Sequence, residues 1–203
     1  MRDLLVFGLS ELGLTPTAEQ VDKILQLHRA LRRWNRVVNL TSVDDEMGFV
    51  TVHVLDSLAI YSYLRGQKVL DVGTGAGFPG LPLAIFFPQI QFVLLDAVAR
   101  KIRFVLQMIL ELKLENAEAV HSRVESYTAE TGFDTIVTRA VAEAGPGFAS
   151  CRHLLAPQGK FLAMKGRYPE IELPGVANLS YKIFSLQIPG LKAQRHLIEI
   201  TQN

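Results

Sequence analysis

The sequence predicts an α/β protein that has a mostly parallel sheet, an N-terminal helical extension and a C-terminal antiparallel hairpin. From Lys68 onward, short runs rich in β-branched residues alternate with longer stretches of helical character, a pattern typical of βαβ units around a parallel sheet. The character of the chain changes near Gly66. A length of 203 residues favours one domain with a short addition. We therefore divide the chain into a helical extension, residues 1–65, and an α/β domain, residues 66–203.

Three helices are expected in the extension. Apolar residues at spacings of three and four mark one face of the main helix, and they are Val21, Ile24, Leu25, Leu31, Trp34 and Val38. The Thr15-Pro16 pair offers a start for it. Residues 3–14 and 50–64 are each predicted to form a further helix.

The α/β domain is predicted to contain five parallel strands. They are expected at residues 68–72, 91–95, 117–120, 135–138 and 160–164, with helices at about 80–87, 99–112 and 144–155. Two later apolar runs, residues 182–188 and 196–201, have no helix between them. These runs predict an antiparallel hairpin at the edge of the sheet.

Composition excludes several classes of protein. Hydrophobic residues make up 49% and charged residues 20%, which is ordinary for a globular chain with a sizeable core. No apolar run reaches the roughly 18 residues of a membrane span, and acids interrupt the apolar N-terminus, so we expect no signal peptide, no membrane contact and a cytoplasmic location. The only cysteine, Cys151, cannot form an internal disulfide. A net charge of +1 gives no bulk attraction to a polyanion, so any nucleic-acid site must be a local patch.

The strongest motif is a glycine-rich turn between a strand and a helix, KVLDVGTGAGFPG, residues 68–80. Such a turn brings a ligand close to the main chain and to a helix N-terminus. Gly73, Gly75 and Gly77 follow the G-x-G-x-G spacing, and Phe78 stands where a nicotinamide dinucleotide pattern needs its last glycine. The spacing therefore predicts a site for S-adenosyl-L-methionine, and a tight turn without a ligand is the alternative.

Two later strand ends add candidate cofactor contacts. Asp96 ends the second strand, about twenty residues after the glycine turn, where an acid can accept hydrogen bonds from a ribose diol. The alternative for Asp96 is a helix cap. The third strand leads into HSRVES, where Val124 is a candidate to cover the adenine ring and Glu125 to face its exocyclic amine.

Several motifs in order resemble one family, RsmG, also called GidB. They are WNRVVNLTS, HVLDS, DVGTGAGFPGLPLA, LLDAVARKIRFV, SRVE, TRAVA and QRHLIEI, and they extend over nearly the whole chain. The resemblance implies a class I S-adenosylmethionine-dependent methyltransferase fold (Rossmann-like) and an enzyme that methylates N7 of guanine 527 in 16S ribosomal RNA. It also implies these cofactor-contacting positions: Gly73, Phe78, Val124, Glu125 and Arg139, with Gly75, Gly77 and Asp96 as neighbours.

One position departs from the family pattern. The family usually has an arginine directly before the histidine of its RHxLDS motif, and this chain has Val52 there. If that arginine contacts RNA in relatives, this protein must rely on other cations. If it pairs with a carboxylate, Asp56 must pair elsewhere.

Methylation at N7 of guanine removes no proton, so no general base is expected and positioning is the main task. Asn39, Arg139 and Lys165 are candidates to hold the guanine O6 edge. Arg139 follows the fourth strand at its carboxyl end, where it can also clamp the cofactor carboxylate or a phosphate. His53 and Asp56 share a helix face and are either substrate contacts or a structural pair.

Two stretches without acids are candidates for contact with RNA. Arg29, Arg32, Arg33 and Arg36 lie within residues 28–40, and Lys165 and Arg167 lie within residues 144–169. The alternative is that these cations only solvate a helix face. No metal-ligand spacing is present among the cysteine and the five histidines, so no metal is expected. The expected partner is 16S rRNA or the small ribosomal subunit, and a monomer is expected.

Two other functions stay open. A methyltransferase that acts on another RNA or on a small molecule would have the same glycine turn and no need of the basic clusters. A ribosome-assembly or RNA-binding protein could keep the fold without catalysis, although the intact glycine turn and Asp96 argue against it.

Overall fold

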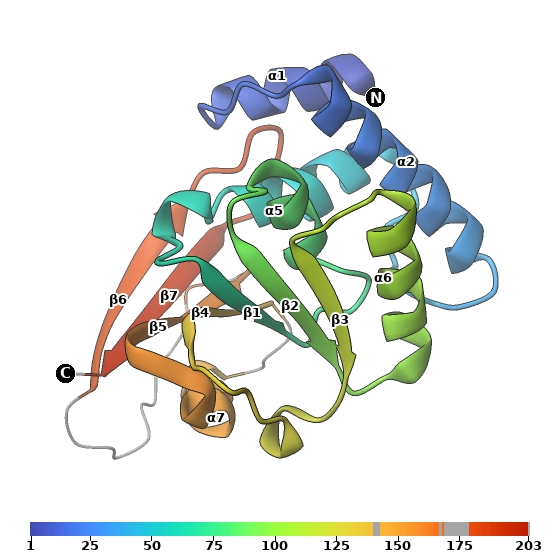
Figure 1. The fold of residues 1–203 in the computed structure, drawn as a ribbon. Helices are drawn as coiled ribbons and strands as arrows, with labels where there is room; N and C mark the ends of the chain where they lie inside the picture. The colour runs from blue at the N-terminus through green and yellow to red at the C-terminus, as the bar shows by residue number, and fades with distance from the viewer. Residues whose placement is uncertain (140–142, 167, 169–178, 203) are drawn as a thin grey trace.

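A seven-stranded sheet forms the centre of the computed structural model (Figure 1), which describes residues 1–139, 143–166, 168 and 179–202. The strands are β1 (Lys68–Val72), β2 (Gln91–Asp96), β3 (Ala117–His121), β4 (Phe133–Thr138), β5 (Leu155–Lys165), β6 (Leu179–Leu186) and β7 (Arg195–Gln202). Their order is β3-β2-β1-β4-β5-β7-β6. Strands β1 to β5 run parallel, and β7 is antiparallel to both β5 and β6. The predicted mostly parallel sheet with a C-terminal antiparallel hairpin is confirmed.

The helices divide between the two faces of this sheet. They are α1 (Arg2–Glu11), α2 (Ala18–Asn35), α3 (Glu46–Gly48), α4 (Asp56–Leu58), α5 (Gly80–Phe86), α6 (Ala99–Glu111) and α7 (Ala144–Cys151). Helices α1, α2, α5 and α6 share one core with the sheet, and α7 belongs to the core on the opposite face (Figure 1). None of the described helices combines the length and apolar character needed to cross a bilayer.

Successive side chains of a strand point to opposite faces of the sheet, and they contribute to both cores. In β2, Leu94 faces the core of α1 and α2, while Val93 faces the core of α7. Leu162 and Phe161 of β5 divide in the same way, as expected for a strand that is covered on both sides. The helical extension therefore packs directly onto the sheet.

Helix α2 begins at a capping box. The Thr17 hydroxyl accepts from the Gln20 backbone N–H at 3.2 Å, and the Gln20 side chain accepts from the Thr17 backbone N–H at 2.9 Å. The helix thus starts two residues after the Thr15-Pro16 pair that the sequence suggests.

The prediction of one helix over residues 50–64 is wrong. The segment Phe49–Leu55 is a π-helix, in which the Asp56 N–H bonds to the Thr51 carbonyl five residues earlier. Helix α4 and a 3-10 turn, Tyr61–Tyr63, follow it. The wider π turn is stabilised from outside the helix, because the Arg139 guanidinium donates to the Val52 carbonyl at 3.0 Å. Such π segments are frequent at functional sites.

Other elements differ in their bounds. The predicted helix 144–155 ends at Cys151 and is followed by a 3-10 turn, Arg152–Leu154, and β5 starts five residues before the predicted 160–164. A register shift between β4 and β5 accommodates this early start. Gln158, within the added residues, has a positive φ of 62°. Strand β6 lies at Leu179–Leu186, slightly before the predicted 182–188.

Candidate active site

The glycine turn lies at the carboxyl end of β1, where ligands bind in open α/β sheets. Gly75 and Gly77 both have positive φ, 62° and 85°, but their surroundings differ. A Cβ on Gly77 would lie 2.3 Å from Leu81 Cδ1, whereas a Cβ on Gly75 would find only the Gly73 carbonyl, at 3.9 Å. Gly77 is therefore needed for packing against α5, and Gly75 faces open space that suits a ligand.

The buried Asp71 carboxylate holds the glycine turn through hydrogen bonds. Its Oδ2 accepts hydrogen bonds from Thr74 Oγ1 at 2.7 Å and from the Gly80 N–H at 2.8 Å. Its Oδ1 is buried without a hydrogen-bond partner among the described residues. Burial raises the pKa of Asp71 to about 6, and the Thr74 and Gly80 hydrogen bonds oppose this shift.

Asp96 ties the turn to the start of α6. Its Oδ2 accepts from the Gly75 N–H at 3.0 Å and its Oδ1 from the Val98 N–H at 2.8 Å. The Lys101 ammonium lies 3.6 Å from Oδ2. Asp96 thus organises the main chain of the turn, as the helix-cap alternative implies. The ribose contact stays a prediction.

A hollow of about 260 Å³ opens beside the turn. It brings together four of the predicted cofactor residues, Gly73, Gly75, Phe78 and Arg139, with Leu40, Thr41, Ser42, His53, Thr74, Ala76 and Lys101. We call it the cofactor hollow. Val124 and Glu125 follow β3 at the same edge of the sheet, in the 3-10 turn Val124–Ser126, but they do not line this hollow. Their predicted contact with adenine stays a prediction.

A buried carboxylate joins three elements next to this hollow. Asp56 is 2% exposed; its Oδ1 accepts from Arg195 Nε at 3.1 Å, and its Oδ2 lies 3.7 Å from Arg139 Nη1. Burial raises the pKa of Asp56, and the two guanidinium groups oppose this shift. The cluster fastens the end of the π-helix to β4 and β7. Asp56 thus has two arginine partners in a chain that carries Val52 before His53, and what the family's arginine does at that position stays open.

His53 forms a wall of the site as a neutral ring. It stacks on Phe78 with ring centroids 4.4 Å apart and an interplanar angle of 10°. Its Nδ1 lies 3.5 Å from Arg139 Nη2, and its Nε2 lies 2.8 Å from Thr41 Oγ1. A guanidinium can only donate, so we assign Nδ1 as the acceptor and Nε2–H as the donor to Thr41. Burial, and then the charge of Arg139, lower the pKa of His53 to about 3.

The His53 ring should therefore show no titration in the physiological range. We expect its Cε1–H resonance, assigned by its loss in His53→Gln, to keep a constant chemical shift between pH 5 and pH 8. The physical reason is that protonation would place a cation against the Arg139 guanidinium in a desolvated site. An NMR titration with a midpoint near the ordinary value of 6.5 would contradict this assignment.

A second hollow, of about 300 Å³, shares four wall residues with the first: Thr41, Ser42, His53 and Arg139. Asp56, Lys165 and Arg195 lie on its other side, together with Val52. Burial lowers the pKa of Lys165. We call this space the acceptor hollow. It contains four of the five predicted positioning residues, His53, Asp56, Arg139 and Lys165.

Asn39, the fifth positioning candidate, is exposed and lines neither hollow. Arg167 lies outside the described residues. Sequence reasoning did not assign Thr41, Ser42, Lys101 or Arg195 to the site, although all four lie within or beside motifs that carry the family resemblance. Among the described residues no three His, Cys, Asp or Glu side chains gather to hold a metal ion, and the absence of a metal stays a prediction.

Comparisons with known proteins agree on a family. The family described as GidB, rRNA small subunit methyltransferase G, matches residues 20–198. A protein of that name from Methylococcus capsulatus is 47% identical over 95% of each chain, and one from Idiomarina loihiensis is 42% identical over 100% of this chain and 99% of its own.

Solved structures agree on the fold. A putative O-methyltransferase from Klebsiella pneumoniae superposes with a TM-score of 0.63 at 13% identity, covering 100% of this chain and 96% of its own. A SAM-dependent methyltransferase from Aquifex aeolicus gives 0.58 at 15% identity, covering 81% and 97%. These likenesses confirm the class I S-adenosylmethionine-dependent methyltransferase fold. The profile match and the relatives at more than 40% identity place the chain in the GidB family of rRNA small subunit methyltransferases.

Proposed function

We propose that this protein transfers the methyl group of S-adenosyl-L-methionine to N7 of guanine 527 in 16S rRNA of the small ribosomal subunit. The observation that carries the proposal is the pair of adjoining hollows at the carboxyl ends of the strands, which share a wall of His53, Arg139, Thr41 and Ser42. One hollow is built on a glycine turn, and the other is lined by cations. Family membership supports the reaction and its substrate.

The residues of the cofactor hollow fit this cofactor. A Cβ on Gly75 would project into open space beside the turn, and Asp96 and Lys101 lie at the neighbouring strand end. The cofactor, when bound, supplies a methyl group on a positively charged sulfur. Gly73 and Gly75 let it approach the main chain, Phe78 offers an apolar wall, and Arg139 is placed to meet its carboxylate.

The acceptor hollow suits a guanine. The N7 lone pair needs no base, and in agreement His53 is held neutral and bonded on both ring nitrogens. Arg139 and Lys165 can donate to O6, the acceptor beside N7. Their positive charge also suits the phosphate of the same nucleotide. The residues therefore orient the base and exclude water rather than move a proton.

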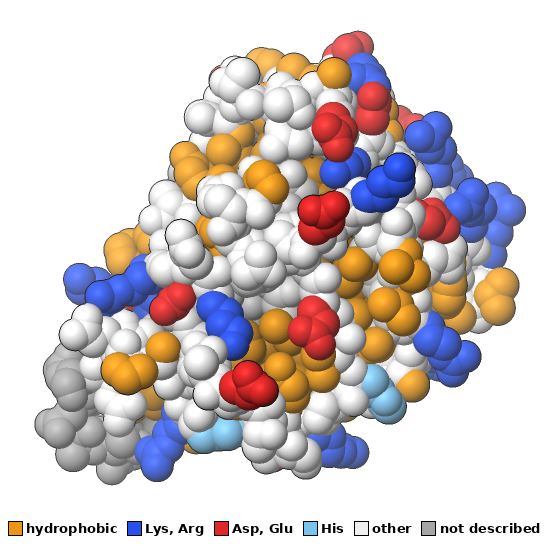
Figure 2. Space-filling view, viewed as in Figure 1, with side chains coloured by type: hydrophobic (Ala, Val, Ile, Leu, Met, Phe, Trp, Pro, Cys, Tyr) orange, Lys and Arg blue, Asp and Glu red, His pale blue; other side chains and the backbone are white. Residues whose placement is uncertain are grey.

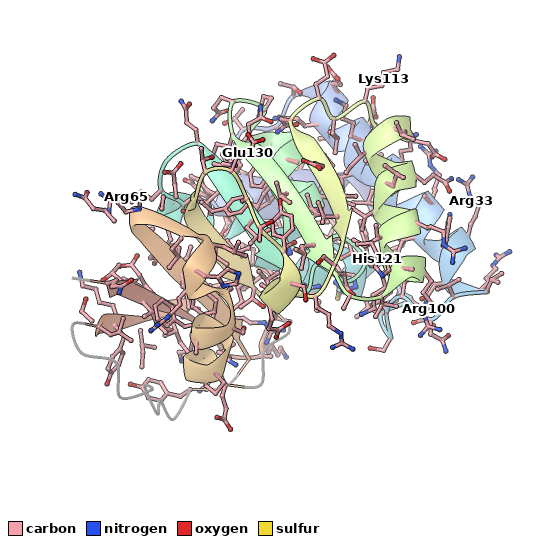
Figure 3. The ribbon with its side chains drawn as sticks, turned by 60° about the horizontal axis from the view of Figure 1, so that its bottom comes forward. Arg33, Arg65, Arg100, Lys113, His121 and Glu130 are labelled. Atoms are coloured by element: carbon pink, nitrogen blue, oxygen red, sulfur yellow. The ribbon has the colours of Figure 1, made fainter. Side chains whose placement is uncertain are left out.

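The basic surface favours RNA over a small molecule. Arg29, Arg32 and Arg33 on α2 and Arg36 directly after it are exposed, and Figure 2 shows blue side chains gathered over this helix. In Figure 3, Arg33 and Arg100, which is at the start of α6, project on the same side of the molecule, while Lys113 lies at the opposite end of α6. We propose this side as the RNA face of a monomeric enzyme.

Mapping the methyl group tests the proposal directly. 16S rRNA from cells with and without the gene would be treated with borohydride and aniline, which cleave at N7-methylguanine. We expect cleavage at guanine 527 only when the gene is present, and its restoration when purified protein and S-adenosylmethionine are added to subunits from the deletion strain. Loss of cleavage at another guanine would overturn the position, and no difference would overturn the activity.

Replacement of Asp96 by alanine should weaken cofactor binding by roughly 1.5–3 kcal/mol, the usual range for loss of a charged hydrogen-bond acceptor. Affinity is expected to fall for two reasons. The substitution removes the predicted ribose contact, and it also removes the acceptor of the Gly75 N–H hydrogen bond. Isothermal titration calorimetry with S-adenosylmethionine measures the affinity. Asp134→Ala is a matched control, because Asp134 accepts backbone N–H bonds at the opposite end of β1. Equal affinity in the wild type and in Asp96→Ala would leave Asp96 only a structural role.

A further inference from the structure

Three hollows follow one another from the acceptor site to the outer face of α2. Thr41 and Val43 line the acceptor hollow and also a second space of about 260 Å³ between α2 and residues 41–45. Two acids, Asp44 and Asp45, also line this second space, so the cationic part of the series is the outer one. The second space in turn shares His28, Arg32 and Arg36 with a larger one of about 550 Å³. Because each pair shares wall residues, the three spaces adjoin one another in series, and we call the two outer ones together the α2 groove.

The larger part of the α2 groove is strongly cationic. Arg29, Arg32, Arg33 and Arg36 all line it, and their guanidinium groups have no carboxylate partner among the described residues. Its one acid, Glu46, already pairs with the Met1 amino group at 3.4 Å. Four unpaired guanidinium groups around one space indicate an anionic ligand.

His28 gives the groove a second, independent sign of a ligand. Its side chain is 4% exposed and lines both parts of the groove, and its Nε2 has no hydrogen-bond partner among the described residues. The ring is fixed against Phe49, with centroids 4.6 Å apart. Buried polar atoms in native proteins are normally paired. This one indicates a polar ligand in the groove, and the ligand reaches Nε2 when the surrounding side chains shift, because the atom itself has no access to solvent here.

We propose that the α2 groove binds the RNA strand that continues from the target guanine, with its phosphates on Arg29, Arg32, Arg33 and Arg36 and one polar group on His28 Nε2. This proposal rests on the proposed function and adds a path for the substrate. Single-stranded nucleic acid binds in such positively charged grooves, where the contacts follow the backbone.

The series of adjoining hollows favours a strand over a free nucleotide. A mononucleotide would need only the 550 Å³ space, with no connection to the active site. Here Thr41 and Val43 belong to both the acceptor hollow and the groove, and Thr41 is also the partner of His53. A strand anchored on α2 would therefore pass directly over the residues that form the guanine site.

The main test is a double variant, Arg32→Gln with Arg33→Gln, assayed on small ribosomal subunits from a deletion strain. We expect at least a tenfold rise in KM for the subunits, with unchanged kcat and unchanged affinity for S-adenosylmethionine. The affinity for a ten-nucleotide RNA that contains the target guanine should lose about 0.7–0.9 of its logarithmic salt slope for each lost phosphate contact. Lys113→Gln is the matched control, because it removes a cation from the far end of α6 (Figure 3).

The experiment distinguishes failure of the groove proposal from failure of the proposed function. If the wild type does not methylate the subunits, the proposed function is wrong. If the wild type methylates them and the double variant behaves like Lys113→Gln in KM and in salt slope, the groove proposal is wrong and the reaction stands.

A second measurement follows His28 without changing it. We expect the Nε2 resonance of His28 to shift when the ten-nucleotide RNA is added and to stay in place when S-adenosylmethionine alone is added. Guanosine monophosphate and inorganic phosphate at the same concentration are the other arms. An equal shift with either of them would make the groove a site for a free nucleotide or phosphate and would overturn the strand proposal, as would no shift with RNA.

Discussion

Gly75→Val should abolish cofactor binding and leave the protein folded. The Cβ of a residue at this position points into open space beside the turn, where the Gly73 carbonyl at 3.9 Å is its only neighbour within 4 Å. A branched side chain there would occupy the cofactor hollow rather than the core. We expect the affinity for S-adenosylmethionine to fall by at least about 100-fold, or roughly 2.8 kcal/mol, as measured by calorimetry.

Backbone strain has to be separated from loss of the ligand space, because φ at Gly75 is +62°, a conformation that a β-branched residue rarely adopts. Gly13→Val is the matched control. Gly13 has a φ of +74° and nothing within 4 Å of its Cβ position, and it follows α1 at a distance from the site. Both variants should lose similar stability in urea denaturation, and only Gly75→Val should lose the cofactor. If both lose it, or neither does, the turn is not the binding site.

Gly77 shows where sequence reasoning about this turn was incomplete. The spacing treats the three glycines alike, yet a Cβ on Gly77 would lie 2.3 Å from Leu81 while Gly75 faces open space. A one-dimensional pattern records which residues permit an unusual φ and does not record what faces them. The strand ends that hold the turn and Asp96 were predictable, because short runs rich in β-branched residues locate strands and parallel strands share a carboxyl edge.

The segment that contains His53 and Asp56 could not be predicted in the same way. Its apolar residues are typical of a helix, but the segment is a π-helix whose Val52 carbonyl accepts a hydrogen bond from Arg139, 87 residues away. The Arg195–Asp56 bond joins residues 139 apart. Such partners come together only when β4 and β7 take their places in the sheet, so no local pattern could assign Arg195 to the site.

The second prediction with a large expected effect concerns the buried Asp56 carboxylate and its two partners, Arg139 and Arg195. Asp56 is nearly fully buried, whereas the Arg139 and Arg195 side chains are 25% and 18% exposed. Removal of one partner of a buried ion pair costs more than the pair itself contributes, because the remaining charge stays desolvated. Here one carboxylate serves two cations, so its loss leaves both guanidinium groups without a carboxylate partner among the described residues.

Asp56→Ala should therefore lower the free energy of unfolding by about 3 kcal/mol, the lower end of the usual range for a broken buried pair, because both arginines retain some contact with water. Urea denaturation at pH 7 measures this. Glu19→Ala, which breaks the exposed i,i+4 pair with Lys23 on α2, should cost only about 0.5 kcal/mol.

A double-mutant cycle of Asp56→Ala and Arg195→Met should show a coupling of about 1 kcal/mol or more, since the double variant removes the buried cation together with its partner. Coupling near zero would mean that Asp56 and Arg195 contribute independently. The contact at 3.1 Å would then not be what fastens the π-helix to β7, and the position of His53 against Phe78 would have to depend on its contacts with Thr41 and Arg139.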